Sequence, residues 1–220
     1  MLGISLLCLT LPLAACGSDK KEKSTTTSSP SSSATTRGCL QTREPPKQEA
    51  GGQKKPKKEL DASKSWSLVV DTNCGSFTIA LDVKTAPNTS ASLVALAKSG
   101  FYNGTTFHRI VPGFVIQGGD PTGTGEGGPG YKTVDKPPAD ASYARGVVAM
   151  AKTQQEASGT AGSQFFVVTG QDAGLRPEYA IVGHVTAGLD VVEKIGQLGD
   201  PATERPTVPV VIKKVTVKQG

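Results

Sequence analysis

The stretch that most constrains the fold is residues 106–131, TFHRIVPGFVIQGGDPTGTGEGGPGY. Two short runs of apolar, mostly β-branched residues, 110–111 and 114–116, flank the turn-forming dipeptide Pro112-Gly113. This alternation predicts a strand, a tight corner and a second strand. Arg109 lies among the apolar residues of the first strand, where a cation is costly unless it faces a partner or a solvent-lined groove. Arg109 is therefore a candidate functional residue.

The rest of the chain also favours short strands. It has 26 Gly and 15 Pro in 220 residues, which fits a turn-rich β protein better than a helical bundle. Further strands are expected over residues 67–71, 76–82, 146–151, 164–169, 180–185 and 208–217. Two helices are expected, one capped by Asn88 or Thr89 and ending at Lys98, the other over residues 188–196. This pattern predicts a mostly β domain over residues 64–220, either a barrel or a sandwich.

The N-terminal residues carry an export signature. Residues 2–15 form an apolar run that is too short to span a membrane and resembles the core of a signal peptide. The run ends in Leu13-Ala14-Ala15-Cys16, which resembles a bacterial lipobox. Residues 1–15 are thus expected to be a lipoprotein signal peptide, with Cys16 lipidated and the protein anchored on the extracytoplasmic side of the cell membrane. The alternative is an ordinary secretory signal with a chance cysteine.

Residues 16–63 are rich in Ser, Thr, Lys and Pro and almost free of large apolar side chains, so a disordered tether is expected. The formal charge of +5 lies mostly here, with ten Lys or Arg against six Asp or Glu in residues 17–63. Residues 64–220 carry fourteen against thirteen. A nucleic-acid enzyme would place its basic patch on the folded domain, so nucleic acid is not an expected partner.

The four cysteines divide by position. Cys8 would leave with the signal peptide and Cys16 would take the lipid, which leaves Cys39 and Cys74 as an even pair in an oxidising compartment. We predict that these two form a disulfide that joins the tether to the domain. The two histidines, His108 and His184, are far apart and have no cysteine partners, so no metal site is expected.

Two common enzyme motifs are excluded by their context. Residues 123–128 match the dinucleotide pattern G-x-G-x-x-G, but Pro129-Gly130 follows where a helix should open, and no βαβ unit is present. Ser163 lacks the glycine pattern of a nucleophile elbow. Nucleotide binding and serine hydrolysis are therefore not expected.

A set of motifs resembles one known family. FHRIVPGFVIQGGD at residues 107–120 closely resembles the signature of cyclophilin-type peptidyl-prolyl isomerases. Met150-Ala151 and GSQFF at 162–166 match the next two landmarks, and AIVG at 180–183 matches the strand before the second helix. The resemblance covers about residues 66–219. It implies a closed eight-stranded antiparallel β-barrel capped by two helices, with the active groove on its outer face.

The resemblance also implies the site. Arg109 corresponds to the catalytic arginine, and Gln117 and Gln164 would hold Arg109 and the substrate backbone. Phe114, Phe166 and Leu175 would line the pocket for the proline ring. The full set of implied substrate-binding residues is Phe114, Val115, Ala151, Lys152, Gln164, Phe166, Leu175 and Tyr179. Isomerisation breaks no bond, so no nucleophile, metal or cofactor is expected.

The sequence departs from the usual family pattern at several positions. Val115 replaces the usual methionine, Lys152 the usual asparagine, and Tyr179 a frequent histidine. No tryptophan lies around residues 174–175, so the indole donor that the family uses toward cyclosporin is missing. We expect weak cyclosporin binding with catalysis retained, and sub-micromolar inhibition would contradict this.

The predicted function is a monomeric isomerase that assists the folding of exported proteins by acting on their proline-containing segments. Two alternatives remain open at this point. One is a cyclophilin-like binding module that captures such segments without turning them over, which would need the pocket but not Arg109. The other is a structural surface lipoprotein, in which the groove residues would be free to vary.

Overall fold

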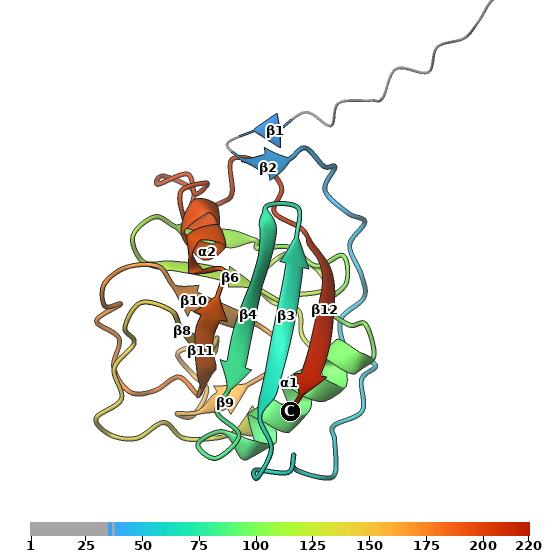
Figure 1. Cartoon of the computed structure of the whole chain (residues 1–220), viewed down its shortest axis with the longest axis vertical. Coiled ribbons are helices and arrows are strands. Elements are labelled where there is room, and N and C mark those ends of the chain that lie inside the picture. The colour runs from blue at the N-terminus through green and yellow to red at the C-terminus, as the bar shows by residue number, and fades with distance from the viewer. Residues whose placement is uncertain (1–34, 37) are drawn as a thin grey trace, which may run out of the picture. The chain divides into compact units, whose positions relative to one another are not determined.

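One eight-stranded antiparallel sheet carries most of the fold in the computed structural model, which describes Thr35–Thr36 and residues 38–220 (Figure 1). Its strand order is β12-β3-β4-β11-β8-β10-β6-β5, and β1-β2 and β7-β9 form two small sheets. The strands are β1 (Thr35–Thr36), β2 (Cys39–Leu40), β3 (Trp66–Thr72), β4 (Gly75–Leu81), β5 (Arg109–Val111), β6 (Val115–Gly118), β7 (Thr133–Val134), β8 (Val147–Met150), β9 (Thr160–Ala161), β10 (Phe165–Val168), β11 (Ile181–Ala187) and β12 (Ile212–Gln219). Every strand predicted within residues 67–185 is present, whereas β1, β2, β7 and β9 were not predicted.

Strands β6, β8 and β10 are buried on both faces. Successive side chains of a strand point to opposite sides of the sheet, and β10 follows this rule. Phe165 and Val167 enter the main core, while Phe166 and Val168 join a second cluster on the other face. In β6, Ile116 joins the main core and Val115 the second cluster. The second cluster forms the apolar base of the candidate site described below.

Helix α1 (Pro87–Lys98) covers the main core. Pro87 occupies the first turn, where its fixed φ suits helix entry. The expected cap by Asn88 or Thr89 is wrong, because the N-cap residue is Ala86 and makes no side-chain cap. The Asp135 carboxylate instead accepts hydrogen bonds from the Thr89 backbone N–H at 2.6 Å and from Asn88 Nδ2 at 2.8 Å. The second predicted helix is present as α2 (Leu189–Gly196).

The sheet curls but does not close, which corrects the prediction of a closed barrel. The outer strands β5 and β12 do not pair as strands. The chain before each of them meets at the isolated bridge Thr106↔Val211, flanked by backbone hydrogen bonds from Phe107 to Val210 and from Ile212 to Thr105. The Ile110 N–H of β5 bonds to the Glu204 carbonyl of a loop, so this loop occupies the edge that β12 would need. Pro206 and Pro209 lack the N–H that a ladder requires, so the last strand also begins later than the predicted residue 208.

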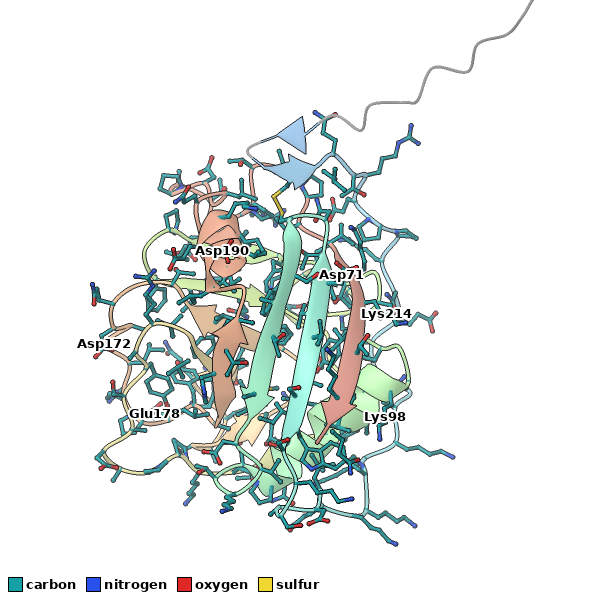
Figure 2. The ribbon with its side chains drawn as sticks, in the orientation of Figure 1. Asp71, Lys98, Asp172, Glu178, Asp190 and Lys214 are labelled. Atoms are coloured by element: carbon teal, nitrogen blue, oxygen red, sulfur yellow. A yellow bond between two sulfur atoms is a disulfide. The ribbon has the colours of Figure 1, made fainter. Side chains whose placement is uncertain are left out.

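Residues 38–63, which we call the N-terminal strap, differ from the predicted disordered tether. The strap follows the domain through backbone hydrogen bonds, including Gln48 N to Pro121 O at 2.9 Å and Gly51 N to Gly128 O at 2.8 Å. Cys39 and Cys74 form the disulfide expected from the cysteine count, drawn in yellow in Figure 2. Hydrogen bonds and one covalent link thus hold a segment that buries few apolar side chains.

The predicted signal peptide at residues 1–15, the lipidation site Cys16 and the tether up to residue 34 lie outside the described residues. Within the part of the chain that the structure describes, no helix has the length and apolar character needed to cross a membrane.

Candidate active site

A cleft of about 330 Å³ opens above the second apolar cluster. Its apolar side chains come from two strands and three loops. Val115 of β6 and Phe166 of β10 point into it, and Phe114, Ala151, Leu175 and Tyr179 lie in the loops. Phe166 is 4% exposed and lies at the base. Most of the residues that the sequence assigned to the site line this cleft: Arg109, Phe114, Val115, Gln117, Ala151, Lys152, Phe166, Leu175 and Tyr179. Gln164 lines a neighbouring cleft of about 230 Å³ that shares Gln117, Ala151 and Lys152.

Arg109 lies at the polar rim of the cleft. It is the first residue of β5 and pairs with Gln117 of β6 in the strand register. Its Nη1 donates to Gln117 Oε1 at 3.5 Å, and its guanidinium carbon lies 6.0 Å from the centroid of the Phe114 ring. Its side chain is 34% exposed. The arrangement places a permanent cation beside an apolar pocket, where its donors remain accessible to a bound chain.

A polar chain continues from Arg109 across the neighbouring strands. Gln117 Nε2 donates to Gln164 Oε1 at 3.1 Å, and Gln164 Nε2 donates to the carbonyls of Gly125 at 2.8 Å and Gly127 at 2.9 Å. Of the two glutamines expected to hold Arg109 and the substrate backbone, Gln117 contacts Arg109 and Gln164 contacts Gln117. Each amide is thus fixed by a neighbour, and the series holds the polar wall of the site in one arrangement.

The glycine-rich loop at residues 123–128 has a structural role. The Asp120 carboxylate accepts hydrogen bonds from the backbone N–H groups of Thr122, Gly125 and Gly127. Burial alone would raise the pKa of Asp120, but hydrogen bonds from Thr122, Gly125 and Gly127 outweigh it and hold the pKa below its usual value. The loop wraps a protein carboxylate and supplies carbonyls to Gln164. No helix follows it, as the sequence context indicated.

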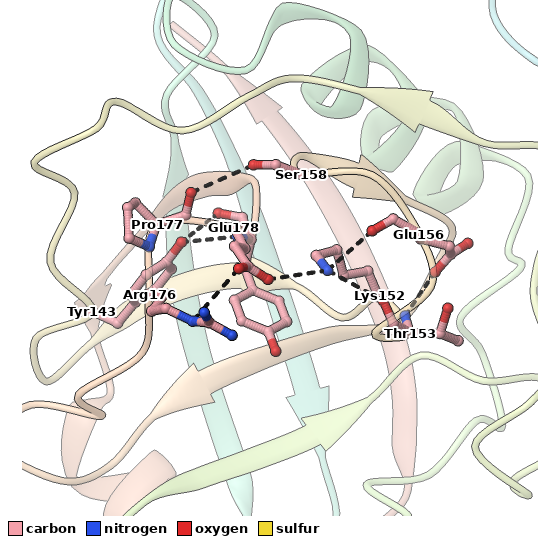
Figure 3. A network of polar contacts seen from close by, with 9 residues as sticks. Tyr143, Lys152, Thr153, Glu156, Ser158, Arg176, Pro177 and Glu178 are labelled. Carbon is pink, nitrogen blue, oxygen red and sulfur yellow. Dashed lines mark hydrogen bonds and ion pairs between the residues drawn. The ribbon is translucent and has the colours of Figure 1, made fainter.

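The Lys152 side chain is held in a network of polar contacts at the edge of the cleft (Figure 3). The side chain is only 3% exposed, and its Nζ lies 3.4 Å from Glu178 Oε2. The same Nζ donates to the carbonyls of Thr153 and Glu156, both at 3.2 Å. A nearly buried ammonium needs such partners, because an unpaired buried charge is strongly unfavourable. The side chain therefore holds the loop at residues 152–156 together.

Tyr143 is a contributor that the sequence did not reveal. It is fully buried, and its hydroxyl donates to the Tyr179 carbonyl at 2.8 Å and accepts from the Tyr179 N–H at 3.0 Å. The Tyr179 ring meets Phe166 edge to face, with centroids 5.6 Å apart. Tyr143 thus fixes the wall that faces the cleft. A lone aromatic residue between Ser142 and Ala144 gave no sequence signal for this role.

Other candidate chemistries lack support in the described residues. Burial lowers the pKa of His108, which favours its neutral form. Ser163 is fully buried and its Oγ donates to the Gly119 carbonyl at 2.7 Å, so it is not presented as a nucleophile. Among residues 35–36 and 38–220, no group of three or more His, Cys, Asp or Glu side chains could hold a metal ion.

Comparisons with known proteins agree with this geometry. Residues 67–217 match the family described as cyclophilin type peptidyl-prolyl cis-trans isomerase/CLD. Peptidyl-prolyl cis-trans isomerase A of Mycobacterium tuberculosis (strain ATCC 25618 / H37Rv) is 41% identical over 169 residues, covering 69% of this chain and 91% of that protein. Peptidyl-prolyl cis-trans isomerase-like 1 of Aspergillus oryzae is 38% identical over 158 residues, covering 70% of this chain and 96% of that protein.

A solved structure shares the fold. The crystal structure of a Cryptosporidium parvum cyclophilin type peptidyl-prolyl cis-trans isomerase has a TM-score of 0.64 and 31% sequence identity with this chain. The match covers 70% of this chain and 98% of that one. The Cryptosporidium protein has also been solved in the presence of the dipeptide ala-pro.

Proposed function

The chain belongs to the cyclophilin-type peptidyl-prolyl cis-trans isomerases, and on that premise we propose that it assists the folding of exported proteins at the outer face of the cell membrane. The observation that carries the assignment of its site is the Arg109 guanidinium beside the apolar cleft over Phe166. The substrates would be proline-containing segments of unfolded or exported chains.

The geometry accounts for the chemistry without a covalent step. Amide resonance gives peptide-bond rotation a barrier of about 18–20 kcal/mol. The barrier falls when the lone pair of the prolyl nitrogen leaves conjugation, and a donor at that nitrogen favours the twisted state. We assign this donor to Arg109, whose charge is permanent and whose side chain is already fixed by neighbours. Each tenfold acceleration requires about 1.4 kcal/mol, which is within the range of such fixed donors.

The apolar pocket would hold the proline side of the bond still while the other side rotates. Phe114, Phe166 and Leu175 would hold the proline ring, and the backbone beside Ala151 and Lys152 would align the rest of the chain. Holding one side of the imide while the other rotates lowers the entropic part of the barrier. This division of roles requires that the pocket and Arg109 act on the same bound peptide.

The decisive experiment measures isomerisation of an Ala-Pro peptide by the full chain and by Arg109→Ala. We expect kcat/KM to fall about a hundredfold, because the variant removes the donor that acts in the transition state. Arg43→Ala removes one arginine from an exposed position outside the cleft and serves as the matched control, with activity unchanged. Equal acceleration by the wild type and Arg109→Ala would contradict the role of Arg109. A binding module without turnover would give no acceleration with either protein.

The proposed location rests on two features. The apolar run at residues 2–15 ends in Leu13-Ala14-Ala15-Cys16, and the domain contains the Cys39–Cys74 disulfide, which is typical of oxidising compartments. Two acyl chains would anchor the protein stably. In bacteria grown with a labelled fatty acid, we expect label on the wild type and none on Cys16→Ser, which would be released from the membrane fraction. An unlabelled wild type would contradict the anchor and leave the isomerase assignment intact.

A further inference from the structure

A loop far along the chain places a carboxylate on the candidate catalytic arginine. Glu204 lies in the loop between α2 and β12, and its Oε2 is 2.7 Å from Arg109 Nε, although the two residues are 95 positions apart. Their side chains are 46% and 34% exposed. A pair that exposed adds little to the stability of a fold. Its place at the site points to another role.

The backbone at Glu204 is unusual. Its φ of 56° makes it the one residue other than glycine with positive φ among those the structure describes. A side chain with a Cβ adopts this conformation at an energetic cost, and such positions cluster at functional sites. Glycine would fit the turn without that cost. The structure therefore keeps a carboxylate at a position where the turn alone would favour glycine.

The loop holds Glu204 in a defined place. The Glu204 carbonyl accepts from the N–H of Ile110, the neighbour of Arg109, at 2.7 Å. The Glu204 N–H donates to the Asp200 carbonyl at 2.8 Å, and the Asp200 N–H donates to the Arg205 carbonyl at 2.8 Å. Asp200 Oδ1 also accepts from the backbone of Ala202 and Thr203. The carboxylate is thus fixed to the same strand that carries its arginine.

Three contacts then determine how the guanidinium lies. The Glu204 carboxylate accepts a hydrogen bond from Arg109 Nε, and Gln117 Oε1 accepts one from Nη1. The Phe114 ring lies beside the guanidinium. Within the part of the chain that the structure describes, Nη2 has no such hydrogen bond and remains for a bound peptide. A fixed donor costs less reorganisation in the transition state than a freely rotating one.

We propose that Glu204 is a positioning residue for isomerisation, which orients the Arg109 guanidinium toward the prolyl nitrogen of the substrate. The proposal rests on the role of Arg109 given above. Glu204 does not line the cleft that would hold the proline ring, so its loss should act on the rate of the bound complex more than on peptide affinity. It also acts only through an arginine, so its effect depends on the residue at position 109.

The test compares Glu204→Gln, Glu204→Gly and the matched carboxylate-to-amide control Glu49→Gln, an exposed residue of the strap. With an uncharged Ala-Pro peptide, Glu204→Gln should lower kcat about three- to fivefold with little change in KM, the upper end of what one exposed ion pair contributes. Glu204→Gly should lose activity similarly while its Tm stays at or above that of the wild type, because glycine relieves the positive φ. Glu49→Gln should match the wild type.

A double-mutant cycle with Arg109→Lys separates positioning from general structural damage. Lysine has no Nε–H fork for the carboxylate to orient, so Glu204→Gln should change kcat less than twofold in that background. The same fractional loss in both backgrounds would overturn the proposal, as would a wild-type kcat in Glu204→Gln when Arg109→Ala is inactive. Full activity in Arg109→Ala would instead overturn the role of Arg109, on which the proposal depends.

Discussion

At the scale of single residues, Asp120 shows how a buried carboxylate supports the site without touching a substrate. Its side chain accepts from Thr122, Gly125 and Gly127, and the loop it organises supplies two carbonyls to Gln164. These bonds outweigh burial and lower its pKa. A group with a lowered folded-state pKa contributes stability above its ordinary pKa, and that contribution is lost as the pH falls through the folded-state value.

We therefore expect Asp120→Asn to lower the free energy of unfolding at pH 7 by about 1–3 kcal/mol, because the amide nitrogen cannot accept hydrogen bonds from the backbone N–H groups that the carboxylate now holds. The free energy of unfolding of the wild type should fall steeply below about pH 4. That of the variant should depend less on pH in this range. Urea unfolding at pH 7 and pH 3 measures both. Asp140→Asn changes an exposed carboxylate and provides the control. Equal unfolding midpoints for Asp120→Asn and the wild type at pH 7 would refute the prediction.

The same scale shows what the sequence could reveal about the site. Arg109, Phe114 and Gln117 lie within one short stretch, so local spacing and family resemblance identified them together. Glu204 and Tyr143 reach the site from distant segments through a single ion pair and a hydroxyl. Neither contact leaves a local pattern, because it exists only once the strands have been arranged in space.

At the scale of secondary structure elements, α1 depends on a residue outside itself. Its own first residues offered two plausible caps, Asn88 and Thr89, yet the Asp135 carboxylate performs this role from 46 positions away in the sequence. A carboxylate also interacts favourably with the positive end of the helix dipole. Local propensity predicted where the helix lies, but the identity of its cap was set by tertiary structure.

Replacing Asp135 with alanine should destabilise the protein by about 1–2 kcal/mol, the usual cost of losing a helix cap. The loss should concentrate at the helix start, so the N–H of Thr89 should exchange with solvent faster than amides near the end of α1. Hydrogen exchange and a thermal melt provide the two measurements. Asp190→Ala, in the first turn of α2, tests for a general effect of removing an acidic side chain at a helix start. Unchanged exchange at Thr89 would show that the carboxylate does not cap α1.

The closed barrel was predicted from family resemblance and is wrong for a reason visible at this scale. Pro206 and Pro209 precede the last strand, and β5 has only three residues. Proline cannot donate to a strand ladder, so the two segments meet through the Thr106↔Val211 bridge and a few backbone hydrogen bonds and not through a continuous pair of strands. The resemblance implied the closed form without regard to the prolines between the last two elements.

At the scale of the whole molecule, the strap shows where composition alone misleads. A segment with few apolar side chains cannot form a hydrophobic core of its own, but it can be held on the surface of a folded domain. The Cys39–Cys74 disulfide, the bond between Leu40 and Asn73, and contacts with the glycine-rich loop all hold the strap. Asn73, which is 5% exposed, also bonds through Nδ2 to Leu40 O and Pro209 O, so it joins the strap to the chain ahead of β12.

Removing the disulfide should release this segment. We expect the Cys39→Ser/Cys74→Ser variant to lose about 2–4 kcal/mol of stability, and its lysines at 54–58 should be cut faster by trypsin. The wild type should behave in the same way after reduction, whereas reductant should not affect the variant. Kinetics of strap cleavage and urea unfolding measure these effects. A strap that is cut equally fast with and without the disulfide would contradict the prediction.

The pairing of β12 with β3 has a consequence for the order in which the protein can be made. β3 is the first strand of the large sheet to leave the ribosome and β12 is the last, yet the two lie side by side from Trp66 to Thr72. Until residue 219 has emerged, one edge of β3 has no partner, and the nascent chain keeps an incomplete sheet. The disulfide partners, only 35 residues apart, can meet much earlier. Completion of the large sheet therefore waits until β12 has been synthesised, long after the disulfide partners are able to meet.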